Sequence, residues 1–180
     1  MRERMLAGQP YVADRELGEL VALAQRRMAA YNSADPTDSA GRRRLLEELI
    51  GEVGEDVELR APVYVDYGSH ISIGARTFAN YGLTALDVAQ ITIGADVQIG
   101  PHVQLLTPTH PVDAEQRRAK WEGGAPITIG DNVWLGGGVI VCPGVTIGEN
   151  TVVGAGAVVV SDLPANVLAV GQPAKVIRQL

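Results

Sequence analysis

The sequence predicts a mainly β fold in which short strands wind into stacked triangular coils, a parallel β-helix preceded by a short helical segment. Aliphatic residues recur at every sixth position in the second half of the chain, whereas residues 1–55 show helical spacing. The chain also combines 21 glycines with only 4% aromatic residues, which suits a core of stacked aliphatics. A period of six matches neither an α-helix nor an alternating strand. It is typical of repeat folds whose coils stack on one another.

The repeat is clearest over residues 129–162. One row of aliphatic residues recurs every six positions, and a second row of small or apolar residues follows each of them by four. Branched side chains favour the strand backbone, and Gly or Asn at the bends relieves the cost of positive φ. A run of ordinary β-hairpins is the alternative, but hairpins do not keep a strict phase of six. The rows are Ile129, Leu135, Val141, Ile147, Val153, Val159 and Val133, Val139, Val145, Thr151, Ala157, Leu163.

The N-terminal part, residues 1–55, is predicted to contain two helices. Asp14 can cap a first helix that extends to Tyr31, because the apolar residues between them keep near-helical spacing. A second helix is expected from about Ser39, and Gly51 marks its end. This segment is too small to be an independent enzyme domain. We therefore expect it to cap one end of the β-helix, as repeat folds require.

Residues 56–180 are predicted to form the β-helix domain, with two irregularities. The six-residue phase slips by two positions between Ala85 and Ile93, and such slips are where a repeat bulges to present side chains. Between residues 106 and 126 the repeat stops in a polar stretch with three prolines. Because long loops on rigid scaffolds commonly carry function, this loop is the first place to look for an active site. In the helical segment, the charge run 42–44 is interpreted as a solvated helix face.

Composition excludes several classes of function. The formal net charge of −6 and a pI near 5.0 do not favour nucleic acid or an anionic membrane as a partner. The N-terminus has no apolar signal core, and no apolar run approaches the roughly 18 residues of a spanning helix. The single Cys142 cannot form an intrachain disulfide, and it is interpreted as a structural residue. These features predict a cytoplasmic protein.

Among the three histidines, His110 is the candidate for catalysis. It lies in the repeat-breaking loop with a proline on either side, and histidine is the side chain best suited to move protons near neutral pH. Glu122, in the same loop, could accept a hydrogen bond from one ring nitrogen and so fix the tautomer. His70 and His102 lie in stretches with a regular strand-like pattern, and both are interpreted as solvent-facing structural residues. No metal is predicted, because no His-x-x-x-His spacing or Cys pair occurs.

The glycines at 136–138 do not form a phosphate-binding loop. The strand–GxxxxGK[ST]–helix pattern is absent, and the phase of the repeat places these glycines at a bend. Their exposed N–H groups could still bind a carbonyl or amide of a ligand.

Several motifs resemble the maltose/galactoside branch of the hexapeptide-repeat O-acetyltransferases. They are MLAGQPYVAD near the N-terminus, DYGSHISIG at 66–74, FAN at 78–80, THPVD at 109–113, PITIGDNVWLGGG at 126–138 and GQPAKVIR at 171–178. The resemblance covers essentially the whole chain. It implies a left-handed parallel β-helix assembled as a homotrimer, with active sites between subunits. It also implies acetyl-CoA as cosubstrate, lying along the β-helix, and a sugar hydroxyl as acceptor.

The same resemblance assigns roles to individual residues. It implies that His110 is the catalytic histidine, with Asn80 near the acceptor and the reacting carbonyl. The acceptor contacts it implies are Asp14, Asp66, Asn80 and Asp87, and the cofactor contacts are Trp134, Gly137, Ala155, Val160, Ser161, Lys175 and Arg178. Asp66 stands where galactoside enzymes have Ser, which favours a maltose-type acceptor. Gly137 lacks a hydroxyl that some members have, and Val160 stands where others have Thr.

Direct acetyl transfer in a ternary complex follows as the expected mechanism. His110 would take the proton of the sugar hydroxyl and later give it to the leaving thiolate, while Asn80 or a backbone N–H stabilises the oxyanion. Three alternatives stay open. The acceptor could be a non-sugar hydroxyl or an amine, the chain could be a zinc-dependent hydratase like the γ-class carbonic anhydrases, or it could be a non-catalytic β-helix scaffold.

Overall fold

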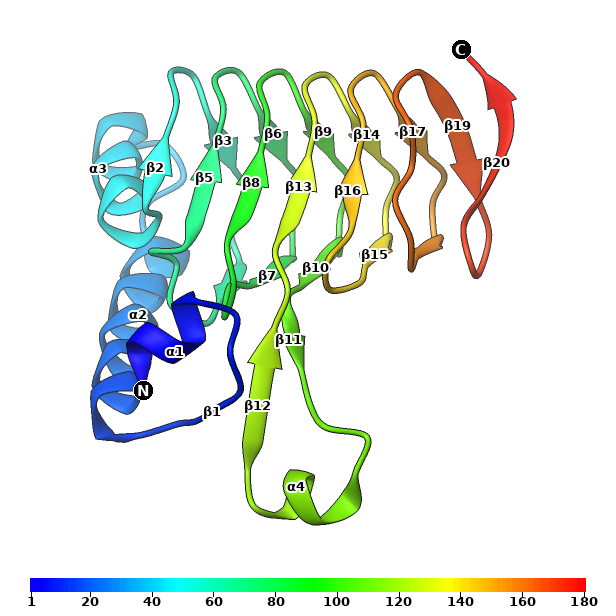
Figure 1. The fold of residues 1–180 in the computed structure, drawn as a ribbon. Helices are drawn as coiled ribbons and strands as arrows, with labels where there is room; N and C mark the ends of the chain where they lie inside the picture. Colours follow the sequence, from blue (N-terminus) through cyan, green and yellow to red (C-terminus); the bar gives the residue numbers. More distant parts are fainter.

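Three faces of short parallel strands form the wall of the β-helix in the computed structural model, which describes residues 1–180 (Figure 1). Face 1 contains β2 (Glu52–Val53), β5 (Ile71–Ile73), β8 (Ile91–Ile93), β13 (Ile127–Ile129) and β16 (Thr146–Ile147). Face 2 contains β3 (Glu58–Leu59), β6 (Phe78–Ala79), β9 (Gln98–Ile99), β14 (Trp134–Leu135), β17 (Val152–Val153), β19 (Val167–Val170) and the antiparallel β20 (Lys175–Gln179). Face 3 contains β4 (Val63–Val65), β7 (Leu83–Leu86), β10 (Gln104–Leu106), β15 (Ile140–Val141) and β18 (Val158–Val159).

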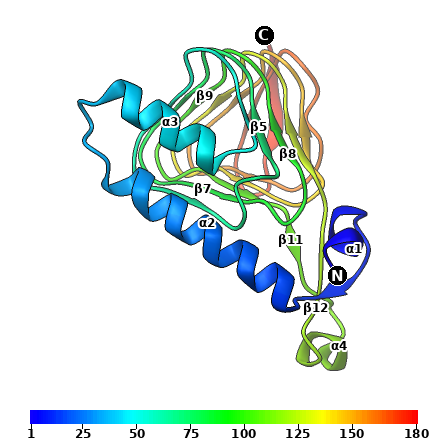
Figure 2. The ribbon, with the colours of Figure 1, turned by 90° about the vertical axis from the view of Figure 1, so that its left-hand side faces the viewer.

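The coil is left-handed, as the resemblance implied. Viewed from the helical end, the chain passes from face 1 (β5, β8) to face 2 (β9) and then to face 3 (β7) in a counter-clockwise sense while it recedes from the viewer (Figure 2). A right-handed coil would turn clockwise. This hand departs from the general preference for right-handed crossovers between parallel strands.

The core consists of the two predicted rows of stacked side chains. Every residue of both rows is at most 5% exposed, which confirms the six-residue phase. Each row member lies directly over its counterpart in the next coil, as in the register of Leu135 with Val153 and of Val141 with Val159. Burial of one such side chain contributes roughly 1.5–3 kcal/mol.

The three corners between the faces differ in content. The asparagine corner, between faces 1 and 2, carries Asn132, Asn150 and Asn166, all with positive φ. The glycine corner, between faces 2 and 3, contains residues 60–62, 80–82, 100–102, 136–138 and 154–156. The loop corner, between faces 3 and 1, contains residues 66–70, 87–90, 107–126, 142–145 and 160–162. Glycine 138 has a φ of 70°, which confirms a bend at residues 136–138.

Both predicted N-terminal helices are present. They are α2 (Arg15–Ser33) and α3 (Ser39–Leu49), and they cover the first coil (Figure 2). The carboxylate of Asp14 accepts a hydrogen bond from the N–H of Leu17 at 3.1 Å, which confirms the predicted cap. The Asn32 amide pairs with both backbone groups of Val63 at 2.9 Å and so satisfies part of the exposed end of face 3. None of the helices is long and apolar enough to cross a membrane.

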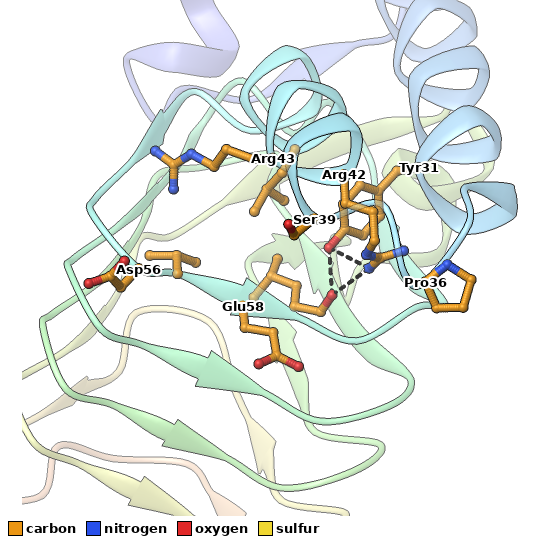
Figure 3. A pocket seen from close by; sticks show the side chains of 10 residues that line it. Tyr31, Pro36, Ser39, Arg42, Arg43, Asp56 and Glu58 are labelled. Carbon is orange, nitrogen blue, oxygen red and sulfur yellow. Dashed lines mark hydrogen bonds between the residues drawn. The ribbon is translucent and has the colours of Figure 1, made fainter.

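The interpretation of residues 42–44 as a solvated helix face is wrong for two of the three arginines. Arg42 donates to the hydroxyl of Tyr31 at 2.9 Å and to the carbonyl of Leu59 at 3.0 Å (Figure 3). Arg43 donates to the backbone carbonyls of Gly54 and Val53, at the start of the first coil, at 2.7 and 3.0 Å. Only Arg44 is exposed. The charged run therefore joins the helical cap to the β-helix, because guanidinium groups can satisfy backbone carbonyls that no further coil covers.

We expect Arg42→Ala to lower the free energy of unfolding by about 1.5–3 kcal/mol, because it removes charge-assisted hydrogen bonds to the first coil. Arg44→Ala, on the same helix and exposed, is the matched control and should change it by no more than about 0.5 kcal/mol. Urea unfolding of the two variants under identical conditions compares them. Equal effects would show that the Arg42 contacts do not hold the cap.

Candidate functional site

The loop corner is where successive coils depart from the regular repeat. Ala85 and Ile93 are both 2% exposed, so the predicted slip of two residues lies between two core positions. Residues 66–70 bulge in the preceding coil and residues 87–90 in this one. In the next coil the bulge becomes the long insertion at 107–126. Three adjacent coils thus present irregular backbone at one corner, beside one another.

Asp87 organises this corner from inside. Its side chain is fully buried, and its carboxylate accepts the backbone N–H groups of Asp66, Tyr67 and His70 at 3.1, 2.8 and 3.1 Å. The N–H groups of a bulge have no strand partner, and a buried carboxylate is a strong acceptor for them. The predicted acceptor contact of Asp87 stays a prediction. In the structure, this carboxylate holds the bulge that carries Asp66 in its conformation.

The interpretation of His70 as solvent-facing is wrong. Its side chain is 7% exposed, and its Nδ1 lies 2.7 Å from the carbonyl oxygen of Asp87. Because a carbonyl only accepts, Nδ1 carries the proton and donates it. His70 therefore has a structural role in the buried side of the corner. His102 is exposed at the glycine corner, as expected.

The insertion folds as a small antiparallel sheet. Strands β11 (Pro108–Thr109) and β12 (Trp121–Gly124) pair with each other, and α4 (Ala114–Arg118) closes the turn between them. The N-terminal β1 (Tyr11–Val12) adds to the other edge of β12, next to α1 (Arg2–Leu6) (Figure 1). The N-terminal segment is therefore more than a cap, since its first part supports the loop that carries His110.

His110 is exposed and borders an open hollow of about 530 Å³. Arg4, Gln116, Trp121 and Glu122 also line this hollow, so the loop brings His110 and Glu122 to one site as predicted. The predicted hydrogen bond between them is not formed. Instead, Glu122 accepts from the hydroxyl of Tyr11 at 2.9 Å, and the His110 ring has no hydrogen-bond partner in the chain. A histidine that lacks an internal partner keeps both nitrogens available for a substrate.

Carboxylates gather near Glu122, which lines the hollow together with His110. Asp66 is half-buried near Asp87 and Glu122, and burial together with these two charges raises its pKa to about 6. Burial, followed by the charge of Asp66, raises the pKa of Tyr67 to about 12. Burial and the hydrogen bond to Glu122 also raise the pKa of Tyr11. Tyr11 and Tyr67 were not predicted, because a two-residue strand and a bulge leave no periodic signal in a sequence. The corner is a negatively charged, partly desolvated surface.

We expect Asp66→Asn to stabilise the protein at pH 8 and not at pH 4. The pKa of Asp66 rises from 3.8 to about 6 on folding, so between these values the folded chain holds a proton that the unfolded chain has released. The free energy of unfolding therefore falls as the pH rises through this window. Asn is neutral at every pH, so the variant does not lose this part of the free energy of unfolding as the pH rises. Thermal unfolding at both pH values tests this expectation. Asp96→Asn is a control of opposite sign, because Arg76 lowers the pKa of Asp96, and a stabilising effect of that variant would contradict the argument.

Asp14 lies at the edge of the same charged group. Its two carboxylate oxygens accept from the N–H of Leu17 and from the N-terminal amine of Met1, the latter at 3.2 Å. The Asp14 carboxylate is also one of the charges that raise the pKa of Tyr67. Two predicted acceptor-binding carboxylates, Asp66 and Asp87, therefore lie at the loop corner that also carries His110 and Glu122, and the Asp14 carboxylate lies close enough to this corner to act on Tyr67.

Asn80 lies at a different corner from His110. It follows β6 at the glycine corner, one face away from the loop corner. Its Oδ1 accepts the backbone N–H of Tyr81 at 2.8 Å. This contact fixes the orientation of the amide, and Nδ2 makes no hydrogen bond in the chain. Asn80 is therefore held as a free hydrogen-bond donor, which suits a carbonyl oxygen or an oxyanion.

The predicted cofactor residues also divide between two parts of the surface. Gly137 and Ala155 lie at the glycine corner, in the coils that follow Asn80, and Trp134 is 56% exposed on face 2. Lys175 and Arg178 are exposed on β20 at the end of the same face. In contrast, Val160 is 54% exposed at the loop corner, where the exposed Ser161 follows it. The chain therefore places the predicted site residues in two separate groups on its surface. No three His, Cys, Asp or Glu side chains converge as metal ligands within the chain.

Comparisons with known proteins identify the family. Residues 4–54 match the maltose acetyltransferase hexapeptide capping motif, and residues 126–161 match the bacterial transferase hexapeptide with six repeats. The galactoside O-acetyltransferase of Escherichia coli is 42% identical over 100% of this chain and 89% of its own length. The fold and its hexads define the hexapeptide-repeat transferases as the class.

Two solved structures show which family within this class the chain belongs to. A maltose O-acetyltransferase from Clostridium difficile superimposes with a TM-score of 0.98 and 42% identity, over 99% of this chain and 96% of that one. A galactoside acetyltransferase in complex with coenzyme A gives a TM-score of 0.96 and 42% identity, over 99% and 90% of the two chains. The chain belongs to the maltose and galactoside O-acetyltransferase family, and it is an acetyltransferase of this type.

Proposed function

We propose that the enzyme transfers an acetyl group from acetyl-CoA to a hydroxyl of a sugar, in a ternary complex, with His110 as general base. The observation that carries the proposal is the division of the predicted residues into two half-sites. His110 and the carboxylates occupy the loop corner, whereas Asn80 and most of the cofactor residues lie at the glycine corner or on face 2. The coenzyme A complex of a relative that superimposes closely supports the choice of donor.

The half-sites join when the loop corner of one subunit meets the glycine corner of another. Such a contact is heterologous, because it uses two different patches, and it needs a closed ring to satisfy every subunit. The homotrimer implied by the family resemblance is such a ring, and each of its three interfaces would hold one complete site. The proposed assembly has three times the 19.0 kDa mass of the chain.

In the proposed reaction, His110 accepts the proton of the sugar hydroxyl while that oxygen forms a bond to the thioester carbonyl carbon. Asn80 of the partner subunit donates its Nδ2–H to the oxyanion of the tetrahedral intermediate. When the C–S bond breaks, protonated His110 gives its proton to the sulfur. The products are a sugar ester and free coenzyme A, and the balance needs no metal. General base catalysis typically contributes about 10²–10⁴-fold, and holding both substrates together contributes through orientation.

The carboxylates of the loop corner favour an acceptor with several hydroxyl groups. Asp66 and Asp14 can accept hydrogen bonds from sugar hydroxyls, and Glu122 does so while it retains Tyr11. The same negative charges disfavour an acceptor that carries a carboxylate or phosphate. An ammonium group on the acceptor would be tolerated, so amino sugars belong in the acceptor series. The reaction requires a compartment that contains acetyl-CoA, in keeping with the predicted cytoplasm.

Thiol release from acetyl-CoA tests the proposal. The wild-type enzyme should release coenzyme A with glucose, maltose or a galactoside, and mass spectrometry should show an ester rather than an amide when glucosamine is the acceptor. His110→Ala should lower kcat by about 10²–10⁴-fold. Val112→Ala, at a side chain that is 96% exposed on the same loop, is the control and should leave kcat unchanged. An undiminished rate in His110→Ala would remove the histidine from the mechanism, and the absence of any sugar ester would refute the acceptor.

A further inference from the structure

The turn below Asn80 continues the same corner toward the helical cap. The N–H of Arg60 donates to the carbonyl of Ala79 at 2.9 Å, and the N–H of Gly82 donates to the carbonyl of Pro62 at 3.0 Å. Residues 60–62 therefore lie directly against residues 80–82, one coil nearer the cap. Whatever binds at Asn80 can extend onto Arg60 without a break in the surface.

Arg60 forms a platform with two aromatic rings there. Its Cζ lies 5.0 Å from the centre of the Phe78 ring and 5.3 Å from that of Tyr81. Cation–π contacts of this kind hold a guanidinium in place at a surface. Its one ion pair, with Glu58 at 3.4 Å, involves two exposed side chains and is weak. The terminal nitrogens of Arg60 make no hydrogen bond in the chain, and Tyr81 is 52% exposed. Within one chain, the platform therefore has an open apolar surface and free donors.

The position of the platform relates it to the acceptor rather than to the cofactor. In the proposed site the acetyl group lies at Asn80, and the cofactor residues Gly137 and Ala155 lie in later coils, away from the cap. An acceptor must approach the acetyl group from the other direction, because the cofactor occupies that side of the corner. On the free side lies Arg60, one coil nearer the cap, with the ring of Tyr81 packed against it.

We propose that Tyr81 and Arg60 bind a second sugar ring of the acceptor, so that the enzyme prefers neutral disaccharides and longer saccharides to monosaccharides. The exposed phenol ring offers an apolar face to the C–H groups of a pyranose. The Arg60 guanidinium presents a rigid fork of N–H donors that suits neighbouring hydroxyls. A second ring also adds binding energy remote from the reacting atoms. This inference rests on the proposed function, since it assumes that the ring to be acetylated lies between Asn80 and His110.

The test compares kcat/KM for maltose and glucose in the wild-type enzyme and in Tyr81→Ala. The wild type should favour maltose, and Tyr81→Ala should lower the maltose-to-glucose ratio by about 3- to 10-fold, mainly through KM for maltose. The substitution keeps the backbone N–H that orients Asn80, so it addresses the ring alone. Tyr81→Phe retains the ring and should retain the ratio.

Two further variants separate the platform from general surface effects. Arg60→Ala should lower the same ratio. Arg76→Ala removes another exposed arginine, which pairs with Asp96 at the asparagine corner, and it should leave the ratio unchanged. If glucose is acetylated and the ratio is unaffected by Tyr81→Ala, the second-ring site is refuted while the proposed function stands. If neither sugar is acetylated by the wild type, both proposals fail.

Discussion

Two inactive variants, His110→Ala and Asn80→Ala, should regain activity when their subunits assemble into one oligomer. In the proposed homotrimer, a single variant lacks one member of every site. Loss of the base costs about 10²–10⁴-fold, and loss of one oxyanion donor costs about 10²–10³-fold in kcat. In a mixed trimer, an interface where the Asn80→Ala subunit supplies His110 and the His110→Ala subunit supplies Asn80 is complete.

The expected recovery follows from the symmetry of the ring. Any trimer that contains both kinds of subunit has one such interface among its three. Random assembly of equal amounts makes about three quarters of the trimers mixed, so the total recovers to about one quarter of the wild-type activity. Co-expression of the two variants with different affinity tags, followed by two-step purification, selects the mixed trimers. Their activity should be about one third of the wild-type value.

The control is a mixture of His110→Ala with the double variant His110→Ala/Asn80→Ala, in which no interface is complete. If the single-variant mixture stays as inactive as this control while light scattering shows mixed trimers, His110 and Asn80 act within one chain or do not act together. That result would contradict the structure, in which one chain carries them on different corners. Few experiments on this enzyme should show so large a change from background.

The wall of the β-helix was predictable because its determinants are local. A six-residue phase requires only that each coil repeat the one before, and both rows of core residues followed from it. Asp14 was likewise recognisable as a cap from its position before an amphipathic stretch. In contrast, Arg42 and Arg43 were assigned to solvent because a charged run on a helix carries no sign of the carbonyls it meets. Those carbonyls belong to the open end of the first coil, which lies outside the helix that carries the arginines.

For the candidate site, the positions of the loop and of the bulge were predictable, but the geometry that relates them to Asn80 was not. The interruption of the repeat identified the loop of His110, and the slip before Ile93 identified the neighbouring bulge. The corner that a residue occupies depends on the lengths of all the irregular coils before it. The sequence therefore does not show that Asn80 and His110 lie at different corners. The contact of Tyr11 with Glu122 joins residues that are 111 positions apart, through a strand too short to have a pattern. Long-range pairs of this kind have no local signature.

The loop corner also shows how the fold accommodates a destabilising group. Asp66 is held where burial and the charges of Asp87 and Glu122 oppose its ionisation. A regular coil has no bulge at this position. Here the buried Asp87 carboxylate accepts the three hydrogen bonds that hold the bulge in place. Perturbed ionisable groups cluster at functional sites for this reason. The burial of aliphatic side chains in the unbroken stack of coils beyond the corner offsets the stability that is lost there.

That stack is the reason to expect Val141→Asp to prevent folding. Val141 is fully buried, with Leu105 in the coil before it and Val159 in the coil after it. A carboxylate at this position has no hydrogen-bond donor within reach except the strand backbone, which is already paired. An unpaired buried charge costs far more than a lost methyl group. Removing one partner of a buried charge pair costs about 3–5 kcal/mol, and whole domains have a free energy of unfolding of about 5–15 kcal/mol. One such substitution therefore removes most of the free energy of unfolding.

Thr146→Asp is the matched control, since Thr146 is exposed on face 1 in the same stretch of the repeat. Circular dichroism and sedimentation of the two proteins, expressed side by side, give the comparison. Thr146→Asp should be folded and trimeric, whereas Val141→Asp should be insoluble or unfolded. A folded Val141→Asp trimer would mean that the inward row is not closely packed. The wall on which the proposed cofactor lies would then be more adaptable than a stack of single aliphatic side chains allows.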